Sequence, residues 1–154
     1  MHTTLATLLL VEDDPNDVML FCRATDKAKL ANPLQVVNDG DAAIAYLGGQ
    51  GQYADRSVYP FPTLMLLDLK LPRKSGLEVL EWLRQQPGIN RLPVVVMTAS
   101  KESADVGKAY DLGANSYLVK PVAFDTLLAM VKALGMYWLI LNENPELPTE
   151  DYTF

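Results

Sequence analysis

Short apolar runs alternate along the chain with longer segments whose apolar residues recur at helical spacing. The runs predict strands at Thr7–Val11, Leu34–Val37, Leu64–Leu67, Val94–Met97 and Ser116–Val119. A continuous apolar run is typical of a parallel strand that is covered on both faces. Because only the first, third and fourth runs have this character, we expect them at the centre of a sheet and the other two at its flanks.

The segments between the runs predict helices at Pro15–Lys29, Asp41–Leu47, Gly76–Gln86, Ser103–Leu112 and Phe124–Leu141. Two of these helices have clear start patterns: Asp14 precedes Pro15, and Ser75 is followed by Glu78 at the spacing of a capping box. Alternating strands and helices joined by right-handed crossovers predict a doubly wound α/β fold. Its five parallel strands are expected in the order 2-1-3-4-5.

The chain has a common length for one domain, and we expect a single domain, 1–154, with its core at about residues 7–141. Residues 48–62 form a long connection that contains Gly, Tyr and Pro, and it is either an inert surface insertion or an interaction loop. Residues 142–154 form an acidic tail.

Composition narrows the classes of function. The net charge of -6 opposes attraction to a phosphate backbone, so we expect no nucleic-acid partner. No apolar run approaches the roughly 20 residues of a membrane span, and the N-terminus lacks a targeting pattern. Cys22 is the only cysteine and cannot form an internal disulfide. A cytoplasmic location is therefore expected.

Acidic residues follow two of the central strands. Glu12 and Asp13 come directly after the first strand, and Asp68 follows the third. In this strand order the two ends meet at the point where ligands bind in doubly wound sheets. Clustered carboxylates suit a hard cation, and an incomplete cage favours Mg²⁺. Taken alone, the pair fits a helix cap or solvated turn as well as a metal site, whereas Asp14 before Pro15 is better explained as a cap.

The residues at two further strand ends favour the metal-site interpretation of the acidic pair. Thr98 follows the fourth strand and Lys120 follows the fifth. Alone, each has an ordinary explanation, as a capping hydroxyl and as a solvated charge. Together they complete a ring of hydroxyl, ammonium, nucleophile and metal carboxylates around one crevice. This combination suits phosphoryl transfer, in which positioning and charge neutralisation do most of the catalysis.

The segments LLLVEDDP, LLDLKLPRKSG, VVMTAS and LGANSYLVKP resemble the motifs of response-regulator receiver domains, the CheY-like, flavodoxin-like family, in family order. The long connection before the third strand and the ending KALGMYWLILNENP also resemble single-domain regulators that are associated with cyanobacterial phytochromes.

The resemblance implies a role for each residue of the ring. Asp68 would be the phosphoacceptor, and Thr98 and Lys120 would bind phosphoryl oxygens. Mg²⁺ would be held by Glu12, Asp13, Asp68 and the backbone carbonyl of Lys70. Tyr117 would be the aromatic switch, with a plain edge-strand aromatic as the alternative, and the bond before Pro121 would be cis. Glu12 stands where many members have aspartate, and Lys70 adds a charge beside the site.

The expected function is that of a single-domain response regulator, phosphorylated by a sensor histidine kinase, with a phytochrome-type kinase favoured. It would signal by phosphorylation-dependent protein–protein interaction, to a downstream response regulator or phosphotransfer protein, and catalyse at most its own phosphorylation and slow dephosphorylation. The alternative is a receiver-shaped scaffold or dimerisation module that is not phosphorylated. A P-loop and a GxSxG elbow are both missing, and His2 is the only histidine.

The last predicted helix is apolar around most of its circumference. One set of its residues can cover the sheet, which leaves a second apolar set on another face. We expect a homodimer through this face and the neighbouring surface, with contacts from Met130, Ala133, Met136, Tyr137 and Ile140. Cover by the 142–154 tail is the alternative.

Overall fold

A computed structural model of the chain describes residues 6–135. They form a parallel sheet with the strand order β2-β1-β3-β4-β5, which confirms the predicted topology. The strands are β1 (Leu8–Val11), β2 (Leu34–Val37), β3 (Leu64–Leu67), β4 (Val94–Thr98) and β5 (Ser116–Val119). Leu8 aligns with Leu34 on one side and with Leu64 on the other, so the three strands end side by side.

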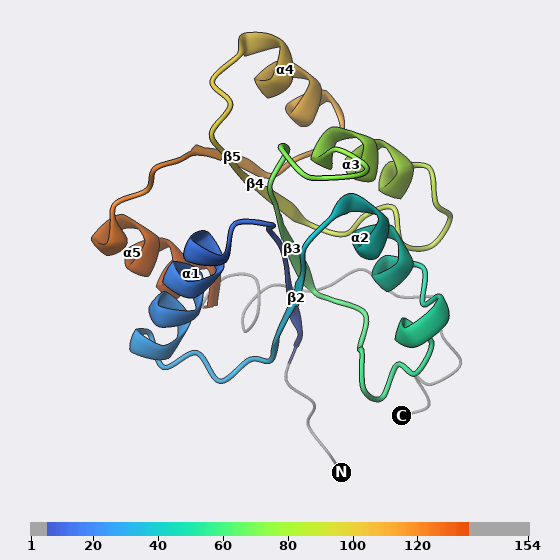
Figure 1. The fold of residues 1–154 in the computed structure, drawn as a ribbon, viewed down its shortest axis with the longest axis horizontal. Coiled ribbons are helices and arrows are strands. Elements are labelled where there is room, and N and C mark those ends of the chain that lie inside the picture. The colour runs from blue at the N-terminus through green and yellow to red at the C-terminus, as the bar shows by residue number, and fades with distance from the viewer. Residues whose placement is uncertain (1–5, 136–154) are drawn as a thin grey trace.

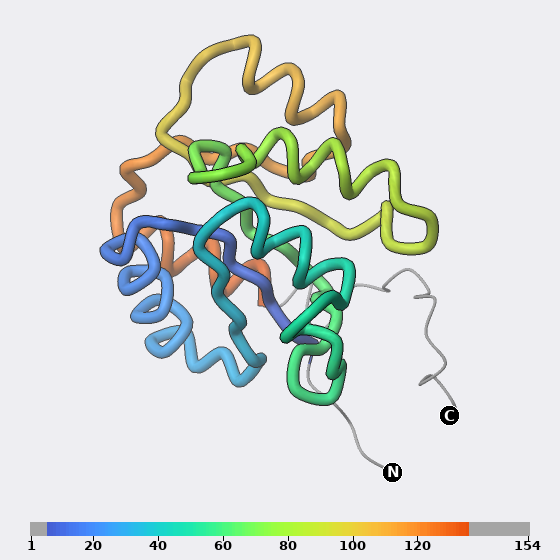
Figure 2. Tube along the Cα trace, turned by 45° about the vertical axis from the view of Figure 1, so that its right-hand side comes forward, coloured from blue at the N-terminus to red at the C-terminus, as the bar shows by residue number. Residues whose placement is uncertain are grey.

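Helices cover both faces of the sheet. The helices are α1 (Pro15–Lys27), α2 (Gly40–Leu47), α3 (Gly76–Arg84), α4 (Ser103–Asp111) and α5 (Phe124–Leu134), with a short 3-10 helix, η1 (Gly51–Tyr53). α1 and α5 pack together on one face, and α2, α3 and α4 lie on the other (Figures 1 and 2). The doubly wound arrangement brings all strand ends to one edge, where the polar strand-end residues gather.

Alternate residues of the central strands point into two separate cores. Leu9, Val11, Met65, Leu67 and Val96 pack with α2 and α3, whereas their neighbours along each strand pack with α1 and α5. The strands β1, β3 and β4 are buried along their whole length, and most residues of β2 and β5 are half-buried. This confirms the predicted division into central and flanking strands.

The described element boundaries lie within two residues of the predicted ones. α1 ends at Lys27 rather than Lys29, because Lys29 adopts a left-handed conformation with φ 55° that a helix cannot include. β4 continues one residue further, to Thr98. α5 is described to Leu134, and its predicted continuation to Leu141 lies outside the described residues, as does the tail 142–154.

The predicted helix starts are confirmed by their hydrogen bonds. The Asp14 side chain accepts from the backbone N–H of Asn16 at 2.8 Å. The Ser75 hydroxyl accepts from the N–H of Glu78, whose carboxylate accepts in return from the N–H of Ser75 at 3.0 Å. These bonds satisfy N–H groups that have no partner within the helix, and they fix the loops that carry the acidic residues.

The 48–62 connection is held against the end of α2 mainly by the side chains of Arg56 and Tyr46. The Arg56 guanidinium donates to the backbone carbonyls of Tyr46 at 2.8 Å, Leu47 at 2.9 Å and Tyr59 at 3.1 Å. The Arg56 Cζ also lies 5.7 Å from the centre of the Tyr46 ring. The Tyr46 hydroxyl donates to the carbonyl of Pro60 at 2.8 Å. The connection therefore has a defined structure.

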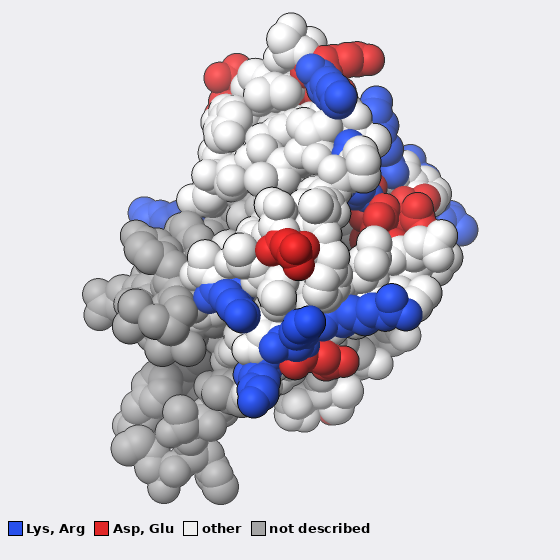
Figure 3. Space-filling model, turned by 90° about the vertical axis from the view of Figure 1, so that its left-hand side faces the viewer, with Lys and Arg blue, Asp and Glu red and all other residues white. Residues whose placement is uncertain are grey.

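The surface on the left of Figure 1, where α1 and α5 lie, carries charges of both signs. α1 and the turn after it expose Arg23, Lys27 and Lys29 together with Asp26. Basic and acidic side chains lie close together on this face (Figure 3), whereas nucleic-acid-binding faces are typically basic throughout. Within residues 6–135, no helix is both long enough and apolar enough to span a membrane.

Candidate functional site

The site lies where β1 and β3 end beside each other. The sheet hydrogen bonding continues past both strands: Glu12 N–H donates to Val37 O at 3.0 Å and Asp68 N–H donates to Val11 O at 3.1 Å. These bonds hold the backbone of both acidic residues in the register of the sheet. A crevice opens above them, lined by Glu12, Asp13, Asp14, Asp17, Asp68, Ala99, Lys120 and Pro121.

Three carboxylates converge in this crevice. One oxygen each from Glu12, Asp13 and Asp68 lies within 4.8 Å of the others. Glu12 is 3% exposed and Asp68 is 6% exposed, whereas Asp13 is open to solvent. Oxygen-only ligands that are buried on one side and open on the other fit a divalent hard cation that keeps some of its water.

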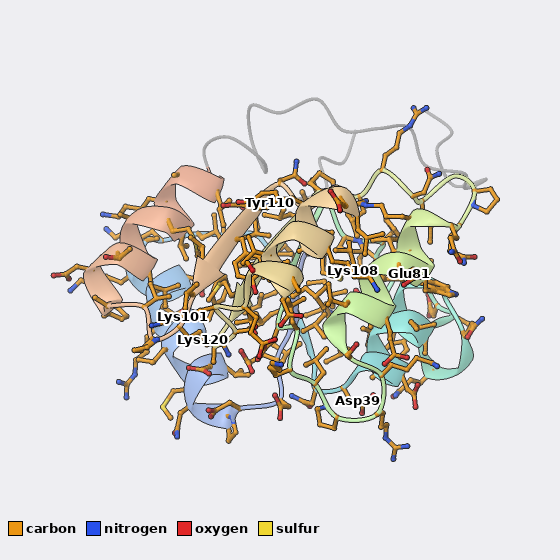
Figure 4. The ribbon with its side chains drawn as sticks, turned by 90° about the horizontal axis from the view of Figure 1, so that it is seen from above. Asp39, Glu81, Lys101, Lys108, Tyr110 and Lys120 are labelled. Atoms are coloured by element: carbon orange, nitrogen blue, oxygen red, sulfur yellow. The ribbon has the colours of Figure 1, made fainter. Side chains whose placement is uncertain are left out.

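Lys120 lies at the centre of the charges. Its backbone follows β5 and is fixed by a hydrogen bond from Lys120 N–H to Thr98 O at 2.8 Å. The ammonium Nζ donates to Asp17 Oδ2 at 2.9 Å, to Asp68 Oδ2 at 3.0 Å and to Glu12 Oε1. Figure 4 shows Lys120 beside α1. The Lys120–Pro121 peptide bond is cis, as the resemblance implied.

The electrostatics of the crevice follow from burial and from these contacts. Burial raises the pKa of Glu12 to about 7, and the hydrogen bond from Lys120 opposes that rise. Burial alone would lower the pKa of Lys120, but hydrogen bonds to Glu12, Asp17 and Asp68 more than offset it, so this pKa lies above its usual value. Lys120 therefore stays charged at neutral pH, while an added cation would favour the ionised form of Glu12.

The predicted hydroxyl donor, Thr98, and the predicted switch aromatic, Tyr117, lie on the β4 and β5 side of the crevice. Thr98 is fully buried at the end of β4, and its hydroxyl accepts from Ser100 N–H at 3.4 Å. The Tyr117 hydroxyl donates to the Ser100 carbonyl at 3.0 Å, and its ring lies 6.4 Å from that of Tyr110 on α4. Tyr117 is thus joined to the segment that begins at Thr98, a contact that a switch would use, while the switch itself stays a prediction.

Lys70 contacts the site through its backbone. Its N–H donates to Asp68 Oδ1 at 3.0 Å, which leaves the other Asp68 oxygen to Lys120. The Lys70 side chain is 63% exposed and its Nζ lies 3.9 Å from Asp105 Oδ2 on α4. Its charge is therefore directed toward α4. The role of the Lys70 carbonyl as a metal ligand stays a prediction.

A glycine fixes the approach of α3 to the nucleophile candidate. A Cβ placed on Gly76 would lie 2.2 Å from the Asp68 carbonyl oxygen, closer than any side chain can come. The backbone of the β3–α3 loop therefore folds directly onto Asp68, and the N–H of Gly76 donates to Leu69 O at 2.9 Å.

The structure adds one residue to the predicted site and places two of the predicted dimer contacts. Asp17 was not among the predicted site residues, because an acid in the first turn of a helix is ordinarily explained by the helix dipole. Its contact with Lys120 is visible only in the structure, where the Lys120 side chain extends from the end of β5 to the first turn of α1. Of the predicted dimer contacts, Met130 is half-buried against the core of its own chain and Ala133 is exposed. Met136, Tyr137 and Ile140 lie outside the described residues.

The fold and the strand-end residues define a response regulator receiver domain, and the chain belongs to that family, whose model matches residues 8–132. Receiver domains are phosphoacceptors that interact with histidine kinases. The response regulator Rcp1 of Synechocystis sp. is 40% identical over 132 residues, which cover 86% of this chain and 88% of the relative.

Solved structures are similar over nearly the whole chain. The Mn²⁺-bound form of Rcp1 has a TM-score of 0.79 at 38% identity and covers 92% of this chain and 99% of its own. The phosphorylated cyanobacterial phytochrome response regulator RcpA has a TM-score of 0.82 at 35% identity, covering 93% and 100%. These matches confirm the predicted fold and the predicted likeness to phytochrome-associated regulators.

Proposed function

We propose that this receiver domain takes a phosphoryl group from a sensor histidine kinase onto Asp68. The observation that carries the proposal is the setting of the Asp68 carboxylate. It is almost buried, one oxygen contacts the Lys120 ammonium at 3.0 Å, and two further carboxylates lie beside it. A structural aspartate has no need of this arrangement, whereas a nucleophile that receives a highly charged group does.

The reaction needs little more than positioning. An Asp68 carboxylate oxygen attacks the phosphorus of phosphohistidine, the new O–P bond gives an acyl phosphate, and the P–N bond breaks to release the imidazole. Lys120 neutralises charge on the transferred oxygens, and the Thr98 hydroxyl donates to another of them. Glu12, Asp13, Asp68 and the Lys70 carbonyl would hold Mg²⁺, which neutralises further charge on the phosphoryl oxygens when bound.

We also propose that Mg²⁺ is the bound ion and that a phytochrome-type kinase is the phosphoryl donor. Support for a divalent ion comes from the carboxylate cluster and from the solved Mn²⁺-bound form of Rcp1. Magnesium suits a site with oxygen ligands and open positions for phosphate oxygens. Support for the kinase comes from the likeness to RcpA, a cyanobacterial phytochrome response regulator whose phosphorylated form has been solved.

The output would be a phosphorylation-dependent change in protein–protein contacts on the α4–β5 side. The hydrogen bond of Tyr117 to Ser100 links this surface to the segment after Thr98, and Tyr110 beside it is 49% exposed. A homodimer, a downstream response regulator or a phosphotransfer protein would be the partner. Sedimentation tests the homodimer: a monomer at micromolar concentration, with and without phosphorylation, would rule it out.

Intact-mass analysis after incubation with Mg²⁺ and acetyl phosphate tests the phosphoacceptor function. We expect the gain of one phosphoryl group that hydroxylamine removes, and no gain with EDTA or in Asp68→Asn. Incubation with an autophosphorylated phytochrome-type kinase tests the donor. If neither donor nor any candidate kinase adds mass, the domain is a scaffold that binds its partners without phosphorylation.

A further inference from the structure

The Lys120 ammonium has three N–H donors, and three different carboxylates accept from them: those of Glu12, Asp17 and Asp68. The Lys120 side chain is 13% exposed, so it is largely shielded from solvent while it makes these contacts. A lysine with every donor paired to a carboxylate is held in one position, in contrast to the freely rotating lysines of a protein surface.

The three acceptors are not equivalent. Glu12 and Asp68 belong to the group whose oxygens converge, whereas Asp17 is outside that group. In the proposed function, Asp68 becomes an acyl phosphate and Glu12 turns toward a metal ion. Of the three carboxylates, only that of Asp17 has no other role in the reaction that would end its hydrogen bond to Lys120.

The position of Asp17 in the fold suits this constant role. It lies in the first turn of α1, whose start is fixed by the Asp14 cap, and α1 packs along α5. Its side chain is 32% exposed, so it approaches Lys120 from the solvent side of the crevice.

We propose that Asp17 is a positioning residue for phosphoryl transfer. It anchors the Lys120 ammonium from the α1 side, so that the lysine stays over the Asp68 carboxylate while the other two acceptors change partners. This inference rests on the proposed phosphoacceptor function and adds to it a residue that does not touch the phosphoryl group. Without the anchor, Lys120 loses its fixed orientation, and the charge on the transferred oxygens is neutralised less well.

The test is the rate of phosphoryl uptake from acetyl phosphate in a set of variants. Removing a charge-assisted hydrogen bond from a positioned group is expected to slow uptake by about tenfold in Asp17→Ala. Asp17→Asn keeps an acceptor oxygen and should recover part of the rate. Asp26→Ala is the matched control, because it removes the same charge from an exposed position on the same helix, and its rate should equal that of the wild type.

A double-mutant cycle separates positioning from a general structural effect. In a Lys120→Met background, with longer incubation, Asp17→Ala should change the rate by less than about twofold, because the residue that it positions is gone. Equal slowing with and without Lys120, or a wild-type rate in Asp17→Ala, would overturn the proposal.

A spectroscopic measurement keeps the inference separate from the phosphoacceptor function. In protein labelled at lysine Cε, the Lys120 signal is assigned by its loss in Lys120→Met. The two Hε protons of a held lysine have different chemical shifts. We expect them to be distinct in the wild type and in Asp26→Ala and to merge in Asp17→Ala. Merged signals in the wild type would contradict the anchor even if phosphorylation occurs, whereas distinct signals without phosphoryl uptake would refute only the phosphoacceptor function.

Discussion

Two cationic side chains, those of Lys120 and Arg56, each connect several segments of this domain, but they bind different kinds of acceptor. Lys120 donates to three carboxylates from two strand ends and one helix. Arg56 donates to three backbone carbonyls and lies over aromatic rings. Backbone carbonyls are neutral and fixed in place, so the Arg56 contacts can only stabilise. Carboxylates can exchange a lysine for a metal ion or for a phosphoryl group, so the Lys120 contacts can take part in a reaction.

The largest effect on the rate of phosphoryl uptake is expected at Lys120. Lys120→Met should slow phosphoryl uptake by about 100- to 1,000-fold, because it removes a preorganised positive charge from the transferred oxygens. Mass analysis over time with acetyl phosphate measures the rate, and circular dichroism checks that the variant is folded. An uptake rate within a few-fold of the wild type would show that Lys120 is a structural cation like Arg56.

Arg56→Met is the matched change at the other cation. It leaves the carbonyls of Tyr46, Leu47 and Tyr59 without their donor, and we expect a loss of about 3 kcal/mol in the free energy of unfolding. Urea unfolding measures this loss. The rate of phosphoryl uptake under native conditions should stay within about twofold of the wild type, since no reacting group is touched. A large fall in rate would mean that the 48–62 connection communicates with the crevice.

Binding of Mg²⁺ should raise the free energy of unfolding through the crevice residues and not through Arg56. At about a hundred times its dissociation constant, a bound ion adds roughly 2.7 kcal/mol to the free energy of unfolding. The expected rise in melting temperature is about 5–10 °C for a domain of this size. Asp13→Asn, a change at an exposed residue, should abolish most of the rise, and Arg56→Met should keep it. An unchanged melting temperature in the wild type would contradict the proposed metal site.

The smallest effect is a pH dependence at Tyr46, beside Arg56. Burial raises its pKa from 10.0 to about 12. A raised pKa means that the neutral tyrosine contributes stability that is fully present below pH 10 and is lost as pH rises toward 12. Tyr46→Phe loses the hydrogen bond to Pro60, about 1 kcal/mol, at neutral pH. The difference from the wild type should shrink and then reverse between pH 10 and 12, as followed by urea unfolding.

The sequence predicts the fold well because its signals are local. The apolar runs of the central strands and the caps at Asp14 and Ser75 each depend only on neighbours along the chain. The strand-end residues Asp68 and Lys120 were also predictable, because the local runs locate the strand ends and the strand order brings those ends to one edge of the sheet. Asp17 and Arg56 were not, because an acid in a helix and a base in a loop have ordinary explanations. Their partners become visible only when the Lys120 side chain at the end of β5 meets the first turn of α1 and the 48–62 connection folds onto α2.

Locating the phosphorylated residue tests most directly whether Asp68 is the phosphoacceptor. Borohydride reduction converts an aspartyl phosphate to homoserine, and trypsin then releases residues 57–70, in which Asp68 is the only acidic residue. We predict homoserine in this peptide after incubation with Mg²⁺ and phosphodonor, and none after incubation with EDTA. Homoserine in another peptide, or an unchanged 57–70 peptide in protein that has gained phosphoryl mass, would contradict Asp68 as the phosphoacceptor.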